Sequence, residues 1–193
     1  MFYDEFSVSE QNSTYYSWAK RNSRPIVKSN ESTRKRANGL LSIDVLTGKE
    51  YLWLTSHAQS DDVARYMAHL AVDMTKEGME QVEILLDRNT THQRKMQALF
   101  KQEVHKLGLD KQIKVIFTYL PAYSPKLNLV EYAIHLLRQD CLHHRPYGMK
   151  LVEIEQKLEQ HLAKGAILTA QQVINILQHI EDLVSLIPSS LVV

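Results

Sequence analysis

The feature that most constrains the fold is an alternation of strand and helix patterns in the second half of the chain. Short apolar runs at residues 82–86 and 113–120 are typical of buried strands. Amphipathic helical patterns cover residues 60–77, 93–107 and 129–142. Strands joined through helices of this length pair in parallel by right-handed crossovers. The pattern therefore predicts a parallel sheet region covered by helices.

The first part of the chain predicts antiparallel strands. Strand-like runs cover residues 2–8, 39–46 and 51–54, and Thr47–Lys49 is a turn signal between the last two. Residues 15–19 are also aromatic and β-prone. An antiparallel meander that leads into βαβ units gives an α/β fold with a mixed sheet flanked by helices.

Two further amphipathic helices are predicted at residues 150–163 and 169–187. We therefore expect a mixed-sheet domain over residues 1–148 and a helical C-terminal extension over residues 149–193 that packs on it. The apolar faces of these last helices suit packing, and they could also form a homodimer surface.

The composition places the chain among ordinary globular proteins. Its 193 residues are 44% hydrophobic and 23% charged, and a single cysteine excludes a disulfide framework. That cysteine, Cys141, is expected to be buried rather than a zinc ligand, and Trp18 and Trp53 are expected in the core or on a sheet face. No apolar run is long enough for a membrane span, and residues 1–5 do not resemble a signal peptide. These features predict a soluble cytoplasmic protein without a membrane partner.

The net charge of +1 hides a strongly basic segment. Residues 20–36 carry one acid, Glu31, and seven bases: Lys20, Arg21, Arg24, Lys28, Arg34, Lys35 and Arg36. As a loop between two strands, this segment would bind DNA phosphates, and a solvated hairpin loop is the alternative.

Three acids occupy positions suited to chemistry. Asp4 lies on the first predicted strand, Asp87 follows the strand at 82–86, and Glu131 lies in the first turn of a helix. If the first strand pairs beside the strand at 82–86, the two aspartates meet at one sheet edge. Three carboxylates suit two Mg²⁺ or Mn²⁺ ions, which clamp the attacking and leaving oxygens in phosphoryl transfer.

Each acid also has a structural alternative. Asp87 could cap the segment that follows it, and Asp4 could be a solvated residue near the terminus. Asn128 and Glu131 have the spacing of a helix capping box.

A family resemblance favours the catalytic interpretation. Residues 86–92, Leu-Asp-Arg-Asn-Thr-Thr-His, resemble the LDNxxxH signature of DDE transposases of the mariner-like insertion-sequence superfamily. Residues 119–131, YLPAYSPKLNLVE, are similar to that family's FLPPYSPELNPIE, and Tyr3–Glu5 and Tyr16–Ala19 resemble its DE and YGWA motifs. The resemblance implies a ribonuclease H-like fold and Mg²⁺-dependent cleavage and strand transfer of DNA. It assigns Asp4, Asp87 and Glu131 as the metal-binding catalytic acids.

Three further residues are predicted to contact DNA near these acids: Arg88, His92 and Arg138. Arg88 replaces the family's asparagine, and it could bind a phosphate or weaken metal binding. His92 matches the family's histidine and could orient a carboxylate or a phosphate; a local hydrogen bond at a helix start is the alternative. Arg138 shares a helix face with Glu131.

The position of Asp4 near the first residue leaves no room before it for the helix-turn-helix modules usual in this family. The expected DNA partners are transposon ends and target DNA, with a separate helix-turn-helix polypeptide supplying sequence recognition. One alternative is an inactive or truncated remnant, or an accessory DNA-binding protein. Another is a different ribonuclease H-like nuclease, such as a resolvase or an RNA–DNA hybrid nuclease, but the long match at residues 119–131 disfavours it.

Overall fold

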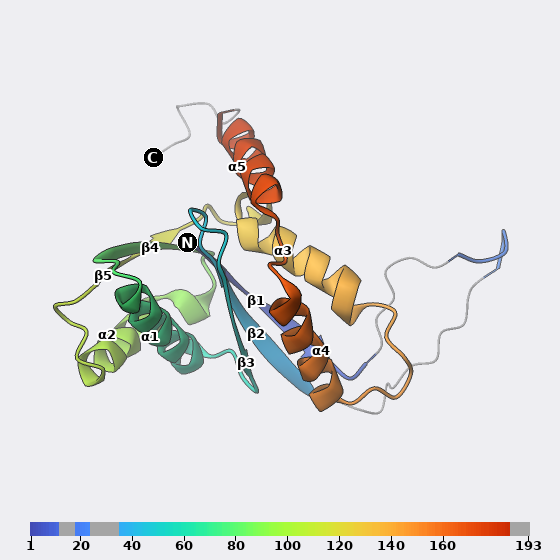
Figure 1. Cartoon of the computed structure of the whole chain (residues 1–193), viewed down its shortest axis with the longest axis horizontal. Coiled ribbons are helices and arrows are strands. Elements are labelled where there is room, and N and C mark those ends of the chain that lie inside the picture. Colours follow the sequence, from blue (N-terminus) through green and yellow to red (C-terminus); the bar gives the residue numbers. More distant parts are fainter. Residues whose placement is uncertain (12–17, 24–34, 186–193) are drawn as a thin grey trace.

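The computed structural model describes residues 1–11, 18–23 and 35–185. It contains a five-stranded sheet in the order β3-β2-β1-β4-β5 (Figure 1). The strands are β1 (Phe2–Ser9), β2 (Arg36–Ile43), β3 (Glu50–Thr55), β4 (Gln81–Leu86) and β5 (Lys114–Tyr119). The α-helices are α1 (Ser60–Lys76), α2 (Arg94–Lys106), α3 (Leu129–Leu137), α4 (Leu151–Lys164) and α5 (Ala170–Ser185).

The pairing of the strands confirms the predicted mixed sheet. β1, β2 and β3 form an antiparallel meander, and β1–β4 and β4–β5 are parallel pairs. β1 is the central strand, as the site prediction required. Of the β-prone segment at 15–19, residues 15–17 lie outside the described part of the chain, and Trp18 and Ala19 are not in a strand.

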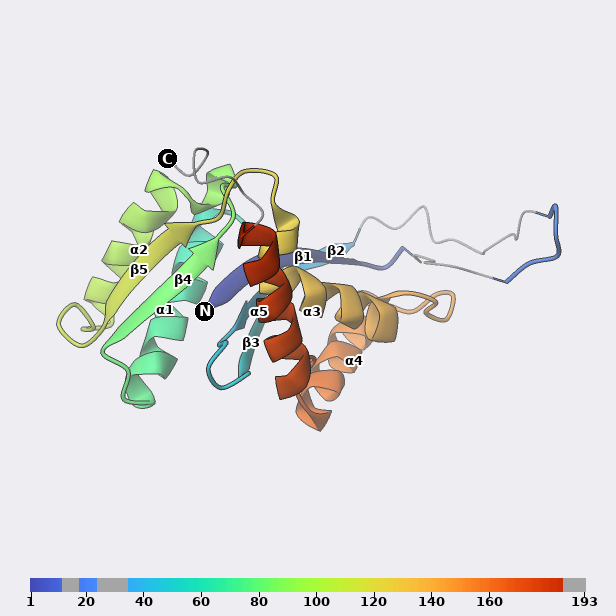
Figure 2. The same cartoon turned by 90° about the horizontal axis from the view of Figure 1, so that it is seen from above.

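Helices cover the two faces of the sheet (Figures 1 and 2). α1 and α2 pack on one face, where a core forms around Tyr3, Met67 and Met96. α3 and α4 pack on the other face, where a second core includes Phe2 and Phe6. Successive residues of a strand face opposite sides of the sheet. Asp4 therefore faces α3, on the same side as Phe2 and Phe6. Glu5 faces α1 and α2, on the same side as Tyr3.

The C-terminal helices share the second core. Ile154 and Leu158 of α4 are fully buried in it. The buried Glu10 carboxylate accepts a hydrogen bond from the Leu151 N–H at 3.0 Å, at the start of α4. Glu50 of β3 similarly accepts from the N–H groups of Ile167 and Leu168, just before α5. These contacts attach the helical extension, and the boundary at residue 148 stays a prediction.

Several local expectations have definite outcomes. The helix predicted over 129–142 is α3 followed by a π-helical turn, Arg138–Leu142, labelled η3. Cys141 is buried, as predicted. The prediction for Trp18 is wrong, because its side chain is fully exposed, whereas Trp53 lies on the sheet face against Tyr66. No helix in the described part of the chain is long and apolar enough to cross a membrane.

Candidate active site

The parallel pairing of β1 with β4 brings the two predicted aspartates to the same level. Phe2 is in register with Leu85, and each aspartate lies two residues further along its own segment. Asp4, Asp87 and Glu131 line one pocket of ≈ 380 Å³. The loop between β5 and α3 completes it with residues 120–125. The three acids chosen from sequence therefore face a common cavity.

Asp4 is held from two sides. Its Oδ1 accepts from the Glu5 N–H at 2.8 Å, and its Oδ2 accepts from the Asn128 side chain at 3.0 Å. Burial, together with the negative charge of Glu131, raises the pKa of Asp4 to about 7. The site thus concentrates negative charge that a cation would neutralise.

Glu131 owes its place to the start of α3. Asn128 is the N-cap, as the capping prediction expected, and its Oδ1 accepts from the Val130 N–H at 3.2 Å. The Asn128 N–H donates to the Pro125 carbonyl at 3.0 Å instead of to Glu131. The Glu131 carboxylate makes no hydrogen bond within the described part of the chain. It is therefore not used in a capping box and is available to the pocket.

Asp87 is anchored by two donors on one oxygen. Its Oδ1 lies 2.6 Å from His92 Nδ1 and accepts a hydrogen bond from the Asn89 N–H at 3.0 Å. The hydrogen bond from His92 lowers the pKa of Asp87 below its ordinary value. Asp87 is consequently a charged carboxylate at neutral pH.

The His92 ring, which contacts Asp87, is itself held in place by its surroundings. The ring is fully buried, and its Nε2 lies 2.7 Å from the Glu5 Oε1. Burial alone would lower the pKa of His92, but the hydrogen bonds with Asp87 and Glu5 raise it to about 10. A buried ring does not have the exposure that the predicted DNA contact needs. Its neighbours fit the other prediction, orientation of a metal-site carboxylate.

Glu5 is not among the site residues predicted from the sequence, although it stands beside Asp4. Its partner is 87 positions away, so no local pattern indicates the contact. Both residues lie in family signatures, Glu5 in the DE motif and His92 in the LDNxxxH motif, but neither signature indicates that the two meet.

The predicted basic residues have different environments. Arg88 is exposed and lines the pocket, where its Nε donates to the Leu120 carbonyl at 3.2 Å. Arg138 is half-buried in η3 and does not line the pocket. In the basic segment, four residues are exposed: Lys20, Arg21, Lys35 and Arg36. The other three lie outside the described residues: Arg24, Lys28 and Arg34.

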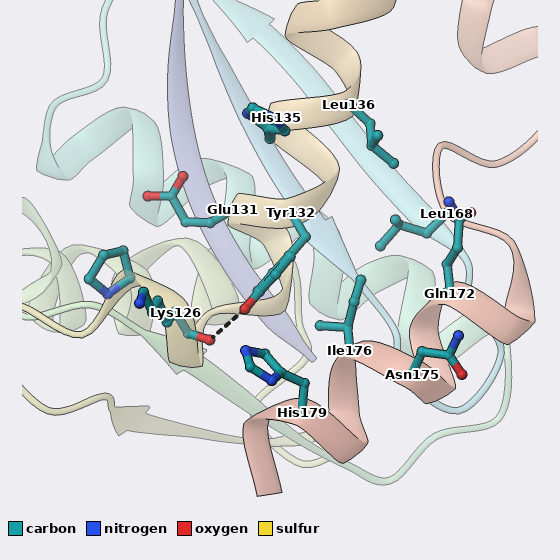
Figure 3. Close-up of a pocket in the computed structure, with 11 residues that line it drawn as sticks. Lys126, Glu131, Tyr132, His135, Leu136, Leu168, Gln172, Asn175, Ile176 and His179 are labelled. Atoms are coloured by element: carbon teal, nitrogen blue, oxygen red, sulfur yellow. Dashed lines mark hydrogen bonds between the residues drawn. The ribbon is translucent and has the colours of Figure 1, made fainter. Parts of the chain in front are cut away.

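A second hollow of ≈ 610 Å³ lies between α3 and α5. Figure 3 shows Tyr132 and Leu136 of α3 facing Ile176 of α5 across it, with Glu131 at its edge. The Tyr132 hydroxyl donates to the Lys126 carbonyl at 3.2 Å. Glu131 thus borders both this hollow and the carboxylate pocket.

The carboxylates of Asp4, Asp87 and Glu131 line one pocket, but they do not surround a single point in it. Among residues 1–11, 18–23 and 35–185, no three His, Cys, Asp or Glu side chains form a ready metal-binding group. The donor set is nevertheless all oxygen, which Mg²⁺ and Mn²⁺ prefer.

Comparison with known families decides the classification. A family model described as DDE superfamily endonuclease matches residues 1–150. The chain belongs to the DDE superfamily endonucleases. A comparison of this DDE endonuclease chain with curated proteins gave no match.

Solved structures similar to the DDE endonuclease chain include several of the Mos1 mariner transposase. The Mos1 paired-end complex with Mn has a TM-score of 0.67 at 15% identity, covering 95% of this chain and 54% of that one. The Mos1 strand transfer complex has a TM-score of 0.66 at 14% identity, covering 95% and 53%. The complex with Mg has a TM-score of 0.65 at 16% identity, covering 95% and 54%. The likeness shows the ribonuclease H-like fold, and the chain spans about half the length of these relatives.

Proposed function

We propose that this chain is the catalytic part of a transposase, which cleaves DNA strands and joins the freed 3′-hydroxyl to target DNA. The observation that carries the proposal is the convergence of Asp4, Asp87 and Glu131 on one pocket. Membership of the DDE endonuclease family supports a DNA phosphodiester as substrate.

The residues in the pocket fit divalent metal ions. The raised pKa of Asp4 reflects burial together with the nearby charge of Glu131, which is the situation that a bound cation relieves. Mos1 structures with Mn and with Mg support these two metals as the candidates. Two bound ions would stabilise the attacking and leaving oxygens of the phosphate. Asp4, Asp87 and Glu131 would hold them.

The chain's own residues have separable roles in this proposal. Asn128 fixes Asp4 relative to α3. Arg88 supplies a cation at the pocket and would contact a DNA phosphate. The basic segment at 20–36 adds sequence-independent contacts with the DNA backbone.

Transposon ends and target DNA are the proposed partners, supported by the Mos1 complex with a transposon end. We also propose a homodimer and a separate helix-turn-helix polypeptide that reads the ends. The second candidate function is a DNA-binding remnant without metal chemistry. It is favoured by Arg88, whose positive charge beside the carboxylates opposes cation binding.

The experiment is a strand-cleavage assay on labelled element-end DNA with Mn²⁺, comparing the wild type with Asp87→Ala. The matched control is Asp110→Ala, which removes an exposed aspartate paired with His105 outside the pocket. The proposal predicts cleavage by the wild type and by the control and none by Asp87→Ala. Equal cleavage by all three proteins would contradict the proposed site, and no cleavage with DNA binding retained would favour the remnant.

A further inference from the structure

We propose that His92 and Glu5 are positioning residues, which together fix the Asp87 carboxylate for metal binding. The inference rests on the proposed function, because it concerns the same carboxylate. It gives a role to the contact between His92 and Glu5, which takes no part in the proposed catalysis by Asp4, Asp87 and Glu131.

The His92 ring bridges two carboxylates from separate parts of the sheet. Nδ1 lies 2.6 Å from the Asp87 Oδ1, beyond the end of β4. Nε2 lies 2.7 Å from the Glu5 Oε1, on β1. A ring that contacts a carboxylate through each nitrogen cannot rotate without losing these contacts, so its orientation is restricted from both ends.

The ring is further fixed by its surroundings. It is fully buried, and the edge-on Tyr3 ring packs against it with centroids 5.5 Å apart. The Tyr119 hydroxyl of β5 donates to the His92 carbonyl at 2.6 Å. The His92 N–H in turn donates to the Asn89 carbonyl at 3.0 Å. His92 is therefore held by β1, β5 and its own turn.

This support gives the Asp87 carboxylate a defined arrangement. Oδ1 receives both the His92 ring and the Asn89 N–H. Within the described residues, no donor reaches the other oxygen, Oδ2. One oxygen is thus occupied by the protein while the second remains available to an ion. The Asp87 side chain is 49% exposed, so without His92 its orientation would depend on the Asn89 N–H among the described donors.

Glu5 acts on Asp87 only through the ring. Asp4 and Glu5 are neighbours in sequence, but Asp4 lines the catalytic pocket and Glu5 does not. Instead, the Glu5 side chain is mostly buried and contacts His92 from the opposite side of the ring. Such outer contacts of a metal ligand commonly change metal affinity by about 10- to 100-fold.

The competing explanation is that the pair simply ties β1 to the turn after β4. In that case its loss would lower the melting temperature and leave the metal affinity of the folded protein unchanged. Metal affinity measured on folded protein therefore separates positioning from structure.

The experiment is a Mn²⁺ titration of the full chain, with free Mn²⁺ followed by electron paramagnetic resonance below the melting temperature of each variant. The variants are Asp87→Ala, His92→Gln, Glu5→Gln and the double variant of the last two. His105→Gln is the matched control. It removes an exposed histidine whose ring lies 2.9 Å from the Asp110 carboxylate, and neither of these residues lines the pocket.

We expect His92→Gln to weaken Mn²⁺ binding by about 10- to 100-fold. Glu5→Gln should weaken it by about fivefold, since a charge-assisted hydrogen bond becomes a neutral one. In the double variant, the Glu5 change should add nothing, because its effect passes through the ring. His105→Gln should bind as the wild type does.

Wild-type affinity in folded His92→Gln would overturn the inference. An equal loss of Mn²⁺ affinity from Glu5→Gln in the wild type and in His92→Gln would also overturn it, because Glu5 would then act by its charge alone. Should His92→Gln not fold, wild-type affinity in Glu5→Gln alone would overturn it. If Asp87→Ala leaves Mn²⁺ binding unchanged, the proposed metal site itself fails.

Discussion

Asn128 joins Asp4 of β1 to α3, the helix that carries Glu131. Its Nδ2 donates to the Asp4 Oδ2 at 3.0 Å, while its Oδ1 accepts the Val130 N–H as the N-cap of α3. Nδ2 also donates to the Tyr3 carbonyl at 3.1 Å. One buried amide thus sets the relation between β1 and α3.

Replacing this residue should separate its two roles. Asn128→Ala removes both the cap and the contact with Asp4, whereas Asn128→Ser keeps a capping oxygen and loses the contact. Both variants should lose DNA cleavage, and the alanine variant should be less stable than the serine variant by about 0.5–2 kcal/mol. Denaturant unfolding and the cleavage assay measure the two effects. Full cleavage by Asn128→Ser would show that the contact with Asp4 is not needed.

The pKa of Asp4 predicts a pH-dependent response to Mg²⁺. This carboxyl has an ordinary pKa of 3.8, raised in the folded protein to about 7, so the free energy of unfolding falls as pH rises between these values. The loss is at most about 4 kcal/mol, because each pKa unit corresponds to about 1.4 kcal/mol. Mg²⁺ must displace a proton at pH 6, but at pH 8 it relieves a carboxylate that is already charged.

Mg²⁺ should therefore raise the melting temperature more at pH 8 than at pH 6. Thermal unfolding at both pH values, with and without Mg²⁺, measures this difference. Asp4→Asn is the control, since its side chain does not titrate. An equal wild-type shift at both pH values contradicts the role of Asp4.

Arg88 should serve DNA rather than metal binding. Arg88→Ala should weaken DNA binding and reduce the dependence of the logarithm of affinity on the logarithm of salt concentration by about one. Its Mn²⁺ affinity should be unchanged or higher, because a nearby cation is removed. Arg94→Ala changes an exposed arginine on α2 and is the control. Unchanged DNA affinity in Arg88→Ala would argue against a phosphate contact.

A buried arginine should be important for stability. The Nη2 of Arg145 donates to the Ser9 and Gln11 carbonyls, and its Nε donates to the Leu142 carbonyl. Arg145→Met leaves these acceptors without their donor and should lower the free energy of unfolding by about 2–4 kcal/mol. Lys101→Met, on the exposed side of α2, should change it by less than about 0.5 kcal/mol. Denaturant unfolding of both variants tests the contrast.

The sequence predicted the features that depend on local periodicity. Alternating apolar patterns located the strands and helices, and the parallel pairing of β4 with β5 followed from the helix between them. The site prediction required β1 to lie beside β4, and the strand order meets that condition. Once β1 was placed at the centre, Asp4 and Asp87 had to meet at one edge. Asn128 as a cap was equally local, because capping depends on a few neighbouring residues.

Features that depend on long-range contacts were not predictable in this way. Glu5 and His92 meet only because β1 pairs with β4, across 87 positions. Arg145 reaches the end of β1 across 136 positions. The exposure of Trp18 also escaped prediction, since an aromatic residue in a β-prone run indicates a strand only when a partner strand covers it.

The central claim is that three carboxylates act together, and Glu131→Gln tests it most directly. The Glu131 carboxylate makes no hydrogen bond in the described part of the chain, so glutamine should preserve the fold while removing its charge. The measurement is the rate of Mg²⁺-dependent cleavage of element-end DNA at unchanged melting temperature. We predict a loss of at least about 1,000-fold, which corresponds to about 4 kcal/mol of transition-state stabilisation. Cleavage by Glu131→Gln at the wild-type rate would contradict the account.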